Sequence, residues 1–377
     1  MVKSGLLPIC LLFLISTPVF AQQAMPELDQ AMNQFYPNEQ DPGVMLYITA
    51  ENNQLIYSKG SGKADLRTST SIDSSTNFRM ASVSKQFTAL AIRYLHAQNK
   101  LKFDQKVTDF FPQLTGNQQL ITIANLLNHT SGIVDYENLI PSNQHVQLND
   151  ANVLDLISTD NVLYFSPGTK FRYSNTGYCL LSLIVEKVTG MKYENFMKDI
   201  LFKDIKMDNS TVFNKLDSIG NRAFGYHKVD TDFQLADQSI TSATKGDGGV
   251  YTSAKDFHNA SLSLIRDVES ILKDSVQSKN LKSAVNDKIN YAQGLFIGLD
   301  NYNNKIYFHS GESTGFHNIV VMIPNRQLCI TLFSNRDDLQ IAPFFDQVLQ
   351  LMDIKIEGIE GESLFLWLNQ VYANQIS

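Results

Sequence analysis

Two polar side chains at the start of a predicted helix have types and spacing suited to nucleophilic catalysis. Residues 78–88 read FRMASVSKQFT, which places Ser82 and Lys85 on one helix face, where their side chains can touch. A serine hydroxyl becomes a good nucleophile when a neighbouring base takes its proton, and a sheltered amine can be that base. Backbone N–H groups at a helix N-terminus can hold a developing oxyanion and disfavour a protonated lysine. The pair therefore predicts acylation of Ser82.

The same spacing occurs elsewhere, so this pair needs support from other motifs. Serine followed three residues later by lysine is also found at Ser242 and Lys245 and at Ser270 and Lys273. A short pattern of this kind, taken alone, is more often a solvated surface pair than a catalytic one.

A second candidate group is Tyr173-Ser174-Asn175, which follows Pro-Gly at residues 167–168 and begins a predicted helix. The tyrosine could transfer a proton, and the asparagine amide could orient Lys85 or a substrate carbonyl. A tyrosine two residues before an asparagine recurs at Tyr136, Tyr193 and Tyr302. Any one such match is by itself more often structural than catalytic.

A third group, His309-Ser310-Gly311, is predicted to end a strand. Because Gly311 lacks a side chain, a substrate backbone could approach the strand edge, and the following N–H groups could complete an oxyanion hole. The alternative is a strand that ends in a turn, with a histidine satisfied inside the fold.

In this order the motifs resemble those of the serine β-lactamase and penicillin-binding protein family, in its class C-like branch with related esterases and D-aminopeptidases. The resemblance covers about residues 44–335. It depends on Ser82-Val83-Ser84-Lys85, LLNHTSG at 126–132, the 167–178 segment with Tyr173-Ser174-Asn175, the glycines at 248–249, and His309-Ser310-Gly311.

The resemblance implies a role for each site residue. Ser82 would be the acylated nucleophile, and Lys85 its base or proton relay. Tyr173 would be the second acid and base, and Asn175 would hold the substrate amide. The N–H groups of Ser82 and Glu312 would form the oxyanion hole, beside the third motif of His309, Ser310 and Gly311. The resemblance implies no cofactor or metal.

Three features narrow the activity within that family. The tyrosine of the second motif argues against class A β-lactamases, which carry Ser-Asp-Asn there. His309 replaces the usual lysine, which helps to hold a substrate carboxylate, and histidine is mostly neutral at pH 7. Glu312 adds a negative charge beside the same place. We therefore expect hydrolysis of small esters or amides, including D-amino-acid peptides, with weak or no turnover of β-lactams.

The sequence is compatible with two alternatives to this hypothesis. Residues 311–315, GESTG, match the nucleophile elbow of α/β-hydrolases, which requires a helix after the serine, whereas a strand is predicted at 316–323. The other alternative is a protein that binds penicillin or senses cell-wall peptides without turnover. The three catalytic residue types are all present, which favours an enzyme.

Composition and the N-terminus indicate where the protein acts. The chain has 377 residues, 43% of them hydrophobic and 18% charged, with a net charge of −7. Because basic residues are not clustered, we expect a small-molecule or peptide partner and no nucleic acid. Lys3, the apolar run at 6–15 and Val19-Phe20-Ala21 predict a signal peptide over 1–21, export to the periplasm or outside the cell, and no stable membrane anchor.

The histidines and cysteines support fewer predictions about function. The seven histidines show no pattern typical of metal ligands, so no metal site is expected. In an oxidising compartment Cys179 and Cys329 could pair or remain buried thiols, and the sequence leaves both open.

Hydrophobic periodicity predicts an α+β fold with strands at both ends of the chain. We expect an antiparallel sheet flanked by helices, with an inserted all-helical lobe. Residues 22–377 would form one module, its α/β part at about 22–98 and 246–377 and its lobe at about 99–245. The predicted helices are 25–36, 82–98, 120–128, 151–158, 176–189, 193–200, 253–267 and 340–353. The predicted strands are 44–50, 54–58, 291–299, 305–309, 316–323 and 327–334. The apolar tail at 362–368 is expected to pack against the body, because no basic residue accompanies it.

Overall fold

A computed structural model describes residues 25–50, 54–159, 161–273 and 281–375. The predicted signal peptide and the turn at 51–53 lie outside the described residues. Within the described part, no helix is both long enough and apolar enough to cross a membrane.

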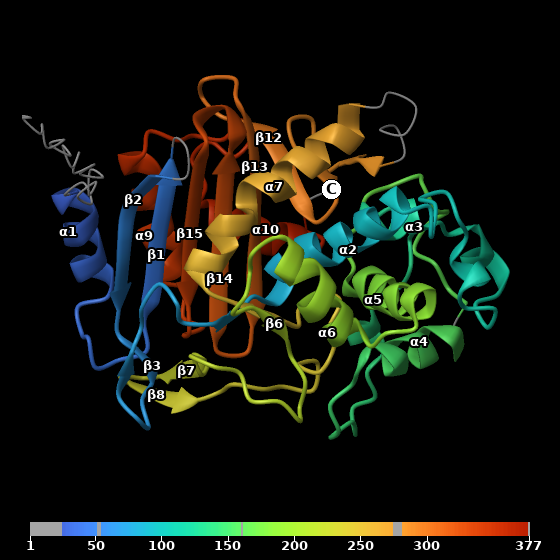
Figure 1. The fold of residues 1–377 in the computed structure, drawn as a ribbon, viewed down its shortest axis with the longest axis horizontal. Coiled ribbons are helices and arrows are strands. Elements are labelled where there is room, and N and C mark those ends of the chain that lie inside the picture. Colours follow the sequence, from blue (N-terminus) through green and yellow to red (C-terminus); the bar gives the residue numbers. More distant parts are fainter. Residues whose placement is uncertain (1–24, 51–53, 160, 274–280, 376–377) are drawn as a thin grey trace, which may run out of the picture.

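The main sheet has eight antiparallel strands and joins the two ends of the chain (Figure 1). Its order is β10-β11-β12-β13-β14-β15-β1-β2, so the N-terminal β1 pairs with the late strand β15. These strands are β1 Val44–Ala50, β2 Gln54–Ser61, β10 Ser283–Ala284, β11 Asn290–Ala292, β12 Leu295–Leu299, β13 Lys305–Ser313, β14 Phe316–Ile323 and β15 Leu328–Ser334.

Helices cover both faces of this sheet, which explains why its central strands carry few polar residues. All eight residues of β14 are buried. Leu46 and Ile48 of β1 face a core with α1, α9 and α10, whereas the alternate residues Met45 and Tyr47 face the core shared with α2 and α7. These helices are α1 Pro26–Phe35, α2 Lys85–Ala97, α7 Ala254–Lys273, α9 Ile341–Leu351 and α10 Leu364–Tyr372. The antiparallel sheet flanked by helices is confirmed.

The helices of residues 99–245 form a separate group beside the sheet, with α2 between the group and the sheet (Figure 1). They are α3 Ile123–Leu127, α4 Asp150–Thr159, α5 Asn175–Thr189 and α6 Tyr193–Phe196, which continues as a π-helix over Met197–Phe202. Short 3-10 helices in the same part of the chain cover Val107–Asp109, Gly116–Leu120 and Tyr136–Leu139, and another covers Pro324–Arg326 between β14 and β15. Local sequence sets the boundaries: Thr122 and Asn125 form a capping box before α3, and Gly190 ends α5 in the left-handed conformation.

This segment is not helical throughout. It contains β6 Thr211–Val212 and the hairpin of β7 Tyr226–Val229 with β8 Asp232–Leu235. The hairpin reaches the main sheet, since Tyr226 forms an isolated bridge with Arg336 just after β15. β6 joins β5 Phe78–Arg79 and β9 Val250–Thr252 in a small sheet, and β3 Lys63–Asp65 pairs with β4 Thr70–Ser71. Short strands of two to four residues carry too little periodicity to be predicted.

Three sequence predictions need correction. The single strand at 291–299 is wrong, because Gln293 and Gly294 have positive φ and turn the chain between β11 and β12. β13 does not end at His309 but continues to Ser313. The helix predicted from residue 82 begins as a 3-10 turn, Ala81–Ser84, and becomes α-helical at Lys85. The tail packs as expected: Leu364, Phe365, Trp367, Leu368 and Val371 are buried.

Candidate active site

Ser82 and Lys85 meet at the junction of the sheet and the helical lobe. The Lys85 Nζ lies 2.9 Å from the Ser82 Oγ. Lys85 is fully buried, and burial lowers the pKa of its amine, against the smaller opposing effects of nearby acidic groups. The amine is thereby biased toward the neutral form that can accept a proton from Ser82. The structure therefore brings the two side chains of the first sequence motif within hydrogen-bond distance.

The backbone at Ser82 is held in an unusual conformation by its neighbours. Ala81 has a φ of 47°, in the left-handed region that non-glycine residues rarely occupy. β13 passes so close that a Cβ on Gly311 would lie 2.2 Å from the Met80 carbonyl oxygen and 3.1 Å from the Ser82 nitrogen. The absent side chain of Gly311 thus lets the third motif approach the nucleophile turn directly.

Two further acceptors surround the Lys85 amine. Its Nζ lies 2.8 Å from the Asn175 Oδ1 and 3.0 Å from the backbone carbonyl oxygen of Asp247. Asn175 is itself fixed, because its backbone N–H donates to Asp135 and its Nδ2 donates to Glu137. Of the two roles considered for Asn175, the structure places it in contact with the lysine.

Tyr173 completes the group beside the nucleophile. The Lys85 Nζ lies 5.1 Å from the centre of the Tyr173 ring. Burial, and then the nearby Tyr372, raise the pKa of Tyr173 well above its ordinary value, although the Ser82 side chain lowers it to a smaller extent. The phenol makes no hydrogen bond of standard geometry to a described residue, so it stays protonated and available as a proton donor.

A cavity of about 420 Å³ opens onto these residues. It is lined by Ser82, Asp135, Glu137, Asn138, Arg172, Tyr173, Asn175, Glu312, Asn369, Tyr372, Ala373 and Asn374. Four larger cavities lie elsewhere on the described part of the chain: those of about 760 and 650 Å³ lie beside the 353–364 segment and beside Leu101 and Thr122, and two more have about 470 and 460 Å³. None of these larger cavities is lined by a candidate catalytic residue, so we identify the 420 Å³ cavity as the candidate active site.

A comparison with protein families gives a match over most of the chain. The model described as Beta-lactamase matches residues 28–343. The chain belongs to the beta-lactamase family. Penicillin-binding protein 4* of Bacillus subtilis is 28% identical over 308 residues, which cover 77% of this chain and 68% of that protein. Protein flp of Staphylococcus aureus is 28% identical over 78% of this chain, but the match spans only 59% of that longer protein.

Solved structures agree on the fold of this beta-lactamase family member. A penicillin-binding protein from Bacillus halodurans has a TM-score of 0.71 and 23% identity, covering 86% of this chain and 98% of that one. D-amino acid amidase from Ochrobactrum anthropi SV3, complexed with L-phenylalanine amide, has a TM-score of 0.69 and 20% identity, covering 87% and 98%. At these identities the likeness concerns the fold.

The third motif of this family member is turned inward. His309 is fully buried, and burial is the largest cause that lowers its pKa to about 3, so the ring is neutral. Its Nδ1 lies 3.1 Å from the Tyr372 hydroxyl. Glu312, the residue after this motif, lines the cavity, whereas His309, Ser310 and Gly311 are not among its lining residues. Burial raises the pKa of Glu312 to about 7.

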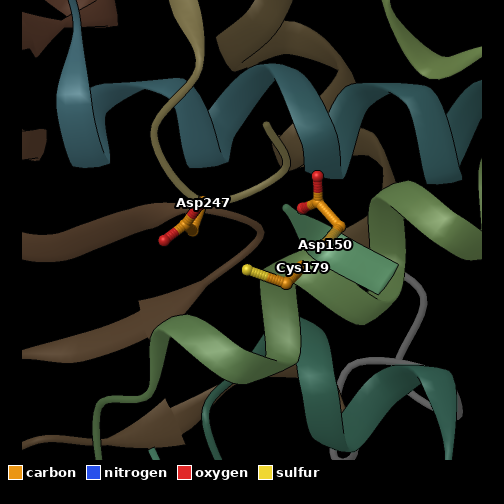
Figure 2. Close-up of side chains that lie close together, drawn as sticks. All are labelled: Asp150, Cys179 and Asp247. Atoms are coloured by element: carbon orange, nitrogen blue, oxygen red, sulfur yellow. The ribbon is translucent and has the colours of Figure 1, made fainter. Parts of the chain in front are cut away.

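Two buried carboxyl groups and a buried thiol lie close together near Lys85, and no sequence motif predicted their association. Figure 2 shows Asp150, Cys179 and Asp247 converging from α4, α5 and the 246–249 loop. One carboxylate oxygen of each aspartate and the Cys179 Sγ all lie within 4.8 Å of one another. The Asp150 carboxylate accepts hydrogen bonds from the backbone N–H groups of Lys245 and Gly246. These bonds fix the loop that presents the Asp247 carbonyl to Lys85. Cys179 and Cys329 are both free thiols.

The cavity contains residues that sequence reasoning missed. Asp135, Glu137, Asn369 and Tyr372 lie outside the five motifs, although Tyr136 between the first two was noted for its spacing to Asn138. The Gly-Asp-Gly-Gly sequence at 246–249 was the one available signal for the loop that carries Asp247. Asn369 and Tyr372 belong to a helix that reads as an ordinary packing element.

Proposed function

We propose that this protein is an exported serine hydrolase that forms an acyl-enzyme on Ser82 with small esters or amides. The observation that carries the proposal is the buried Lys85 amine, 2.9 Å from the Ser82 Oγ at the edge of a cavity. Export is inferred from residues 1–21, whose sequence is typical of a signal peptide.

The contacts of Lys85 support its role as the base. A neutral amine has two hydrogens and one lone pair. If the hydrogens are donated to the Asn175 Oδ1 and the Asp247 carbonyl, the lone pair faces the Ser82 hydroxyl. Lys85 then takes the serine proton as the Oγ bonds to the substrate carbonyl carbon.

Tyr173 has the chemistry of the second proton donor. Its phenol stays protonated and borders the cavity next to Ser82. We infer that it passes a proton to the leaving alcohol or amine as the acyl bond breaks, and receives one through Lys85. In the second half-reaction the same groups activate a water molecule, which releases the acid and restores Ser82.

The charges around the cavity limit the substrates. Asp135, Glu137 and Glu312 line it together with the guanidinium of Arg172. Burial raises the pKa of all three carboxyls, and those of Glu137 and Glu312 to about 7, so the cavity gains negative charge as the pH rises through neutrality. An anionic substrate is therefore disfavoured, which supports neutral esters and amides over β-lactams, with their carboxylate. The shared fold with D-amino acid amidase supports D-amino-acid amides and peptides as the amide substrates to test.

Intact-mass measurement with an activated phosphonate and, separately, a penicillin tests this function. We expect the wild type and Ser313→Ala to gain the phosphonate mass and Ser82→Ala to gain none. Ser313 is the matched control, since it is the serine of the competing GESTG motif. Labelling that survives in Ser82→Ala would overturn the assignment. A stable adduct with no ester or amide turnover would instead indicate a penicillin-binding or sensing protein.

A further inference from the structure

The C-terminal helix enters the catalytic cavity. α10 packs on β13, and its end lies near the junction of the sheet and the helical lobe (Figure 1). Asn369, Tyr372, Ala373 and Asn374 line the same cavity as Ser82. The helix therefore contributes a wall of the site, although it is far from the sequence motifs along the chain.

Tyr372 uses the polar groups of the third motif. Its hydroxyl accepts a hydrogen bond from the Ser310 N–H at 3.1 Å and lies 2.9 Å from the Ser310 Oγ. It is also 3.1 Å from the His309 Nδ1, and its ring stacks on the His309 ring at 5.6 Å with an interplanar angle of 21°. Few hydrogen-bonding groups of His309 and Ser310 are thus left for a substrate.

The same helix also engages the next residue of the motif. The Asn369 Nδ2 donates to a Glu312 carboxylate oxygen at 3.2 Å. The Tyr372 ring lies 4.6 Å from the Tyr173 ring, so it borders the nucleophile side of the cavity as well. α10 therefore contacts the third motif through two side chains that are one turn apart.

The Tyr372 hydroxyl lies where one oxygen of a bound carboxylate could lie, because either oxygen can accept from the Ser310 N–H and from the Ser310 hydroxyl. A substrate carboxylate would have to displace it. Having done so, it would meet a neutral histidine and the nearby Glu312, with no lysine in the motif. The Tyr372 hydroxyl therefore occupies the place that a substrate carboxylate would take, and an ionised Glu312 would repel that carboxylate.

We propose that Tyr372 is a specificity-determining residue that fills the third-motif subsite and makes the enzyme select uncharged substrates over carboxylate-bearing ones. This inference rests on the proposed function, because it assigns the substrate class of that same site. It differs from a purely structural role for Tyr372 in predicting that its removal creates a new binding capacity.

A matched pair of esters, 3-acetoxybenzoate and 3-acetoxybenzamide, tests the selection, because they differ in the charge of the leaving group. We expect the wild type to prefer the amide. Tyr372→Ala should shift the ratio of kcat/KM toward the carboxylate by about tenfold, chiefly through KM, as one hydrogen bond to a charged group predicts. Tyr372→Phe keeps the ring in place, so we expect the ratio to shift by less than about threefold.

Controls separate this effect from loss of structure. Tyr302→Phe and Tyr302→Ala alter an exposed tyrosine outside the cavity and should leave the ratio unchanged. Tyr372→Val retains apolar surface but cannot reach Ser310, so it replaces the alanine variant if that variant does not fold. A folded Tyr372→Ala or Tyr372→Val protein with the wild-type ratio would overturn the proposal.

A binding measurement distinguishes this proposal from the proposed function. In Ser82→Ala, calorimetry with 3-hydroxybenzoate and 3-hydroxybenzamide requires no turnover. Adding Tyr372→Ala should strengthen benzoate binding about tenfold relative to the benzamide. That gain without wild-type hydrolysis of either ester would refute the hydrolase and retain the subsite. Hydrolysis without that gain would refute the subsite and retain the hydrolase.

Discussion

Replacement of Gly311 by alanine should disable the site through a single methyl group. The added Cβ would lie 2.2 Å from the Met80 carbonyl oxygen, 3.0 Å from the Val83 nitrogen and 3.1 Å from the Ser82 nitrogen. All three are backbone atoms of the turn that carries the nucleophile. A side-chain rotation cannot relieve the contact, so β13 and this turn must separate.

The size of the effect follows from that separation. The distance to the Met80 oxygen must grow by about 1.2 Å, from 2.2 Å to the 3.4 Å at which ordinary contact begins. Overpacking of a well-packed interior costs about 1–3 kcal/mol of the free energy of unfolding. A displacement of about 1 Å at reacting groups lowers catalysis by about 100-fold. We expect Gly311→Ala to fold, with lower stability and a kcat/KM reduced by about that factor.

Urea unfolding and hydrolysis of a chromogenic neutral ester measure the two effects. Gly298→Ala on β12 is the matched control, because the atoms nearest to its Cβ are side-chain atoms at 3.5–3.7 Å. We expect this control to keep its activity and to gain about 0.5–1 kcal/mol, as alanine is favoured over glycine inside a strand. A Gly311→Ala protein with wild-type kcat/KM would refute the close approach of β13 to Ser82.

Three further predictions concern titratable groups. Because burial lowers the Lys85 pKa and the neutral amine is the proposed base, kcat/KM should rise with pH to a plateau. Asp247→Asn removes a negative charge that raises the Lys85 pKa, so the rising part of the pH profile should move to lower pH. A shift to higher pH would contradict the assignment of Lys85 as the base. The His309 ring, with its pKa lowered to about 3, should show no NMR titration between roughly pH 5 and 8, and a midpoint near 6.5 would disprove its burial. Cys179 and Cys329 should react with a thiol reagent only after unfolding, because both are buried and burial raises their pKa; rapid labelling of the folded protein would contradict this.

Much of the fold was predictable because periodicity reports burial. β14 was predicted with its observed bounds, since a run of eight buried residues between turns leaves little choice of element. The 291–299 segment failed because Gln293-Gly294 interrupts an apolar run without a polar stretch, so the hairpin has no signal in composition. The sheet order was also not predictable, because the pairing of β1 with β15 depends on residues nearly three hundred positions apart, such as Gly43 and Asn335.

The candidate site also contains residues that could be predicted from the sequence and residues that could not. Ser82, Lys85, Tyr173 and Asn175 could be nominated because each lies within a short local motif, and the structure brings them together. Asp150 and Asp247 could not be nominated. The Asp150 carboxylate holds the 246–249 loop by accepting backbone hydrogen bonds, and Asp247 contributes its backbone carbonyl to Lys85, which a residue of any type could do.

Tyr372 is the clearest case of a functional contact that sequence conceals. It lies 62 residues after Ser310, on a helix that is held mainly by buried apolar side chains. Burial of Phe365, Trp367 and Leu368 fixes the helix, and its last residue is carried by that packing onto the third motif. Any chain with the same Ser-x-x-Lys, Tyr-x-Asn and His-Ser-Gly motifs but another C-terminal helix would have a different subsite there. We therefore expect the motifs to define the reaction and the packing of α10 to define which substrates reach it.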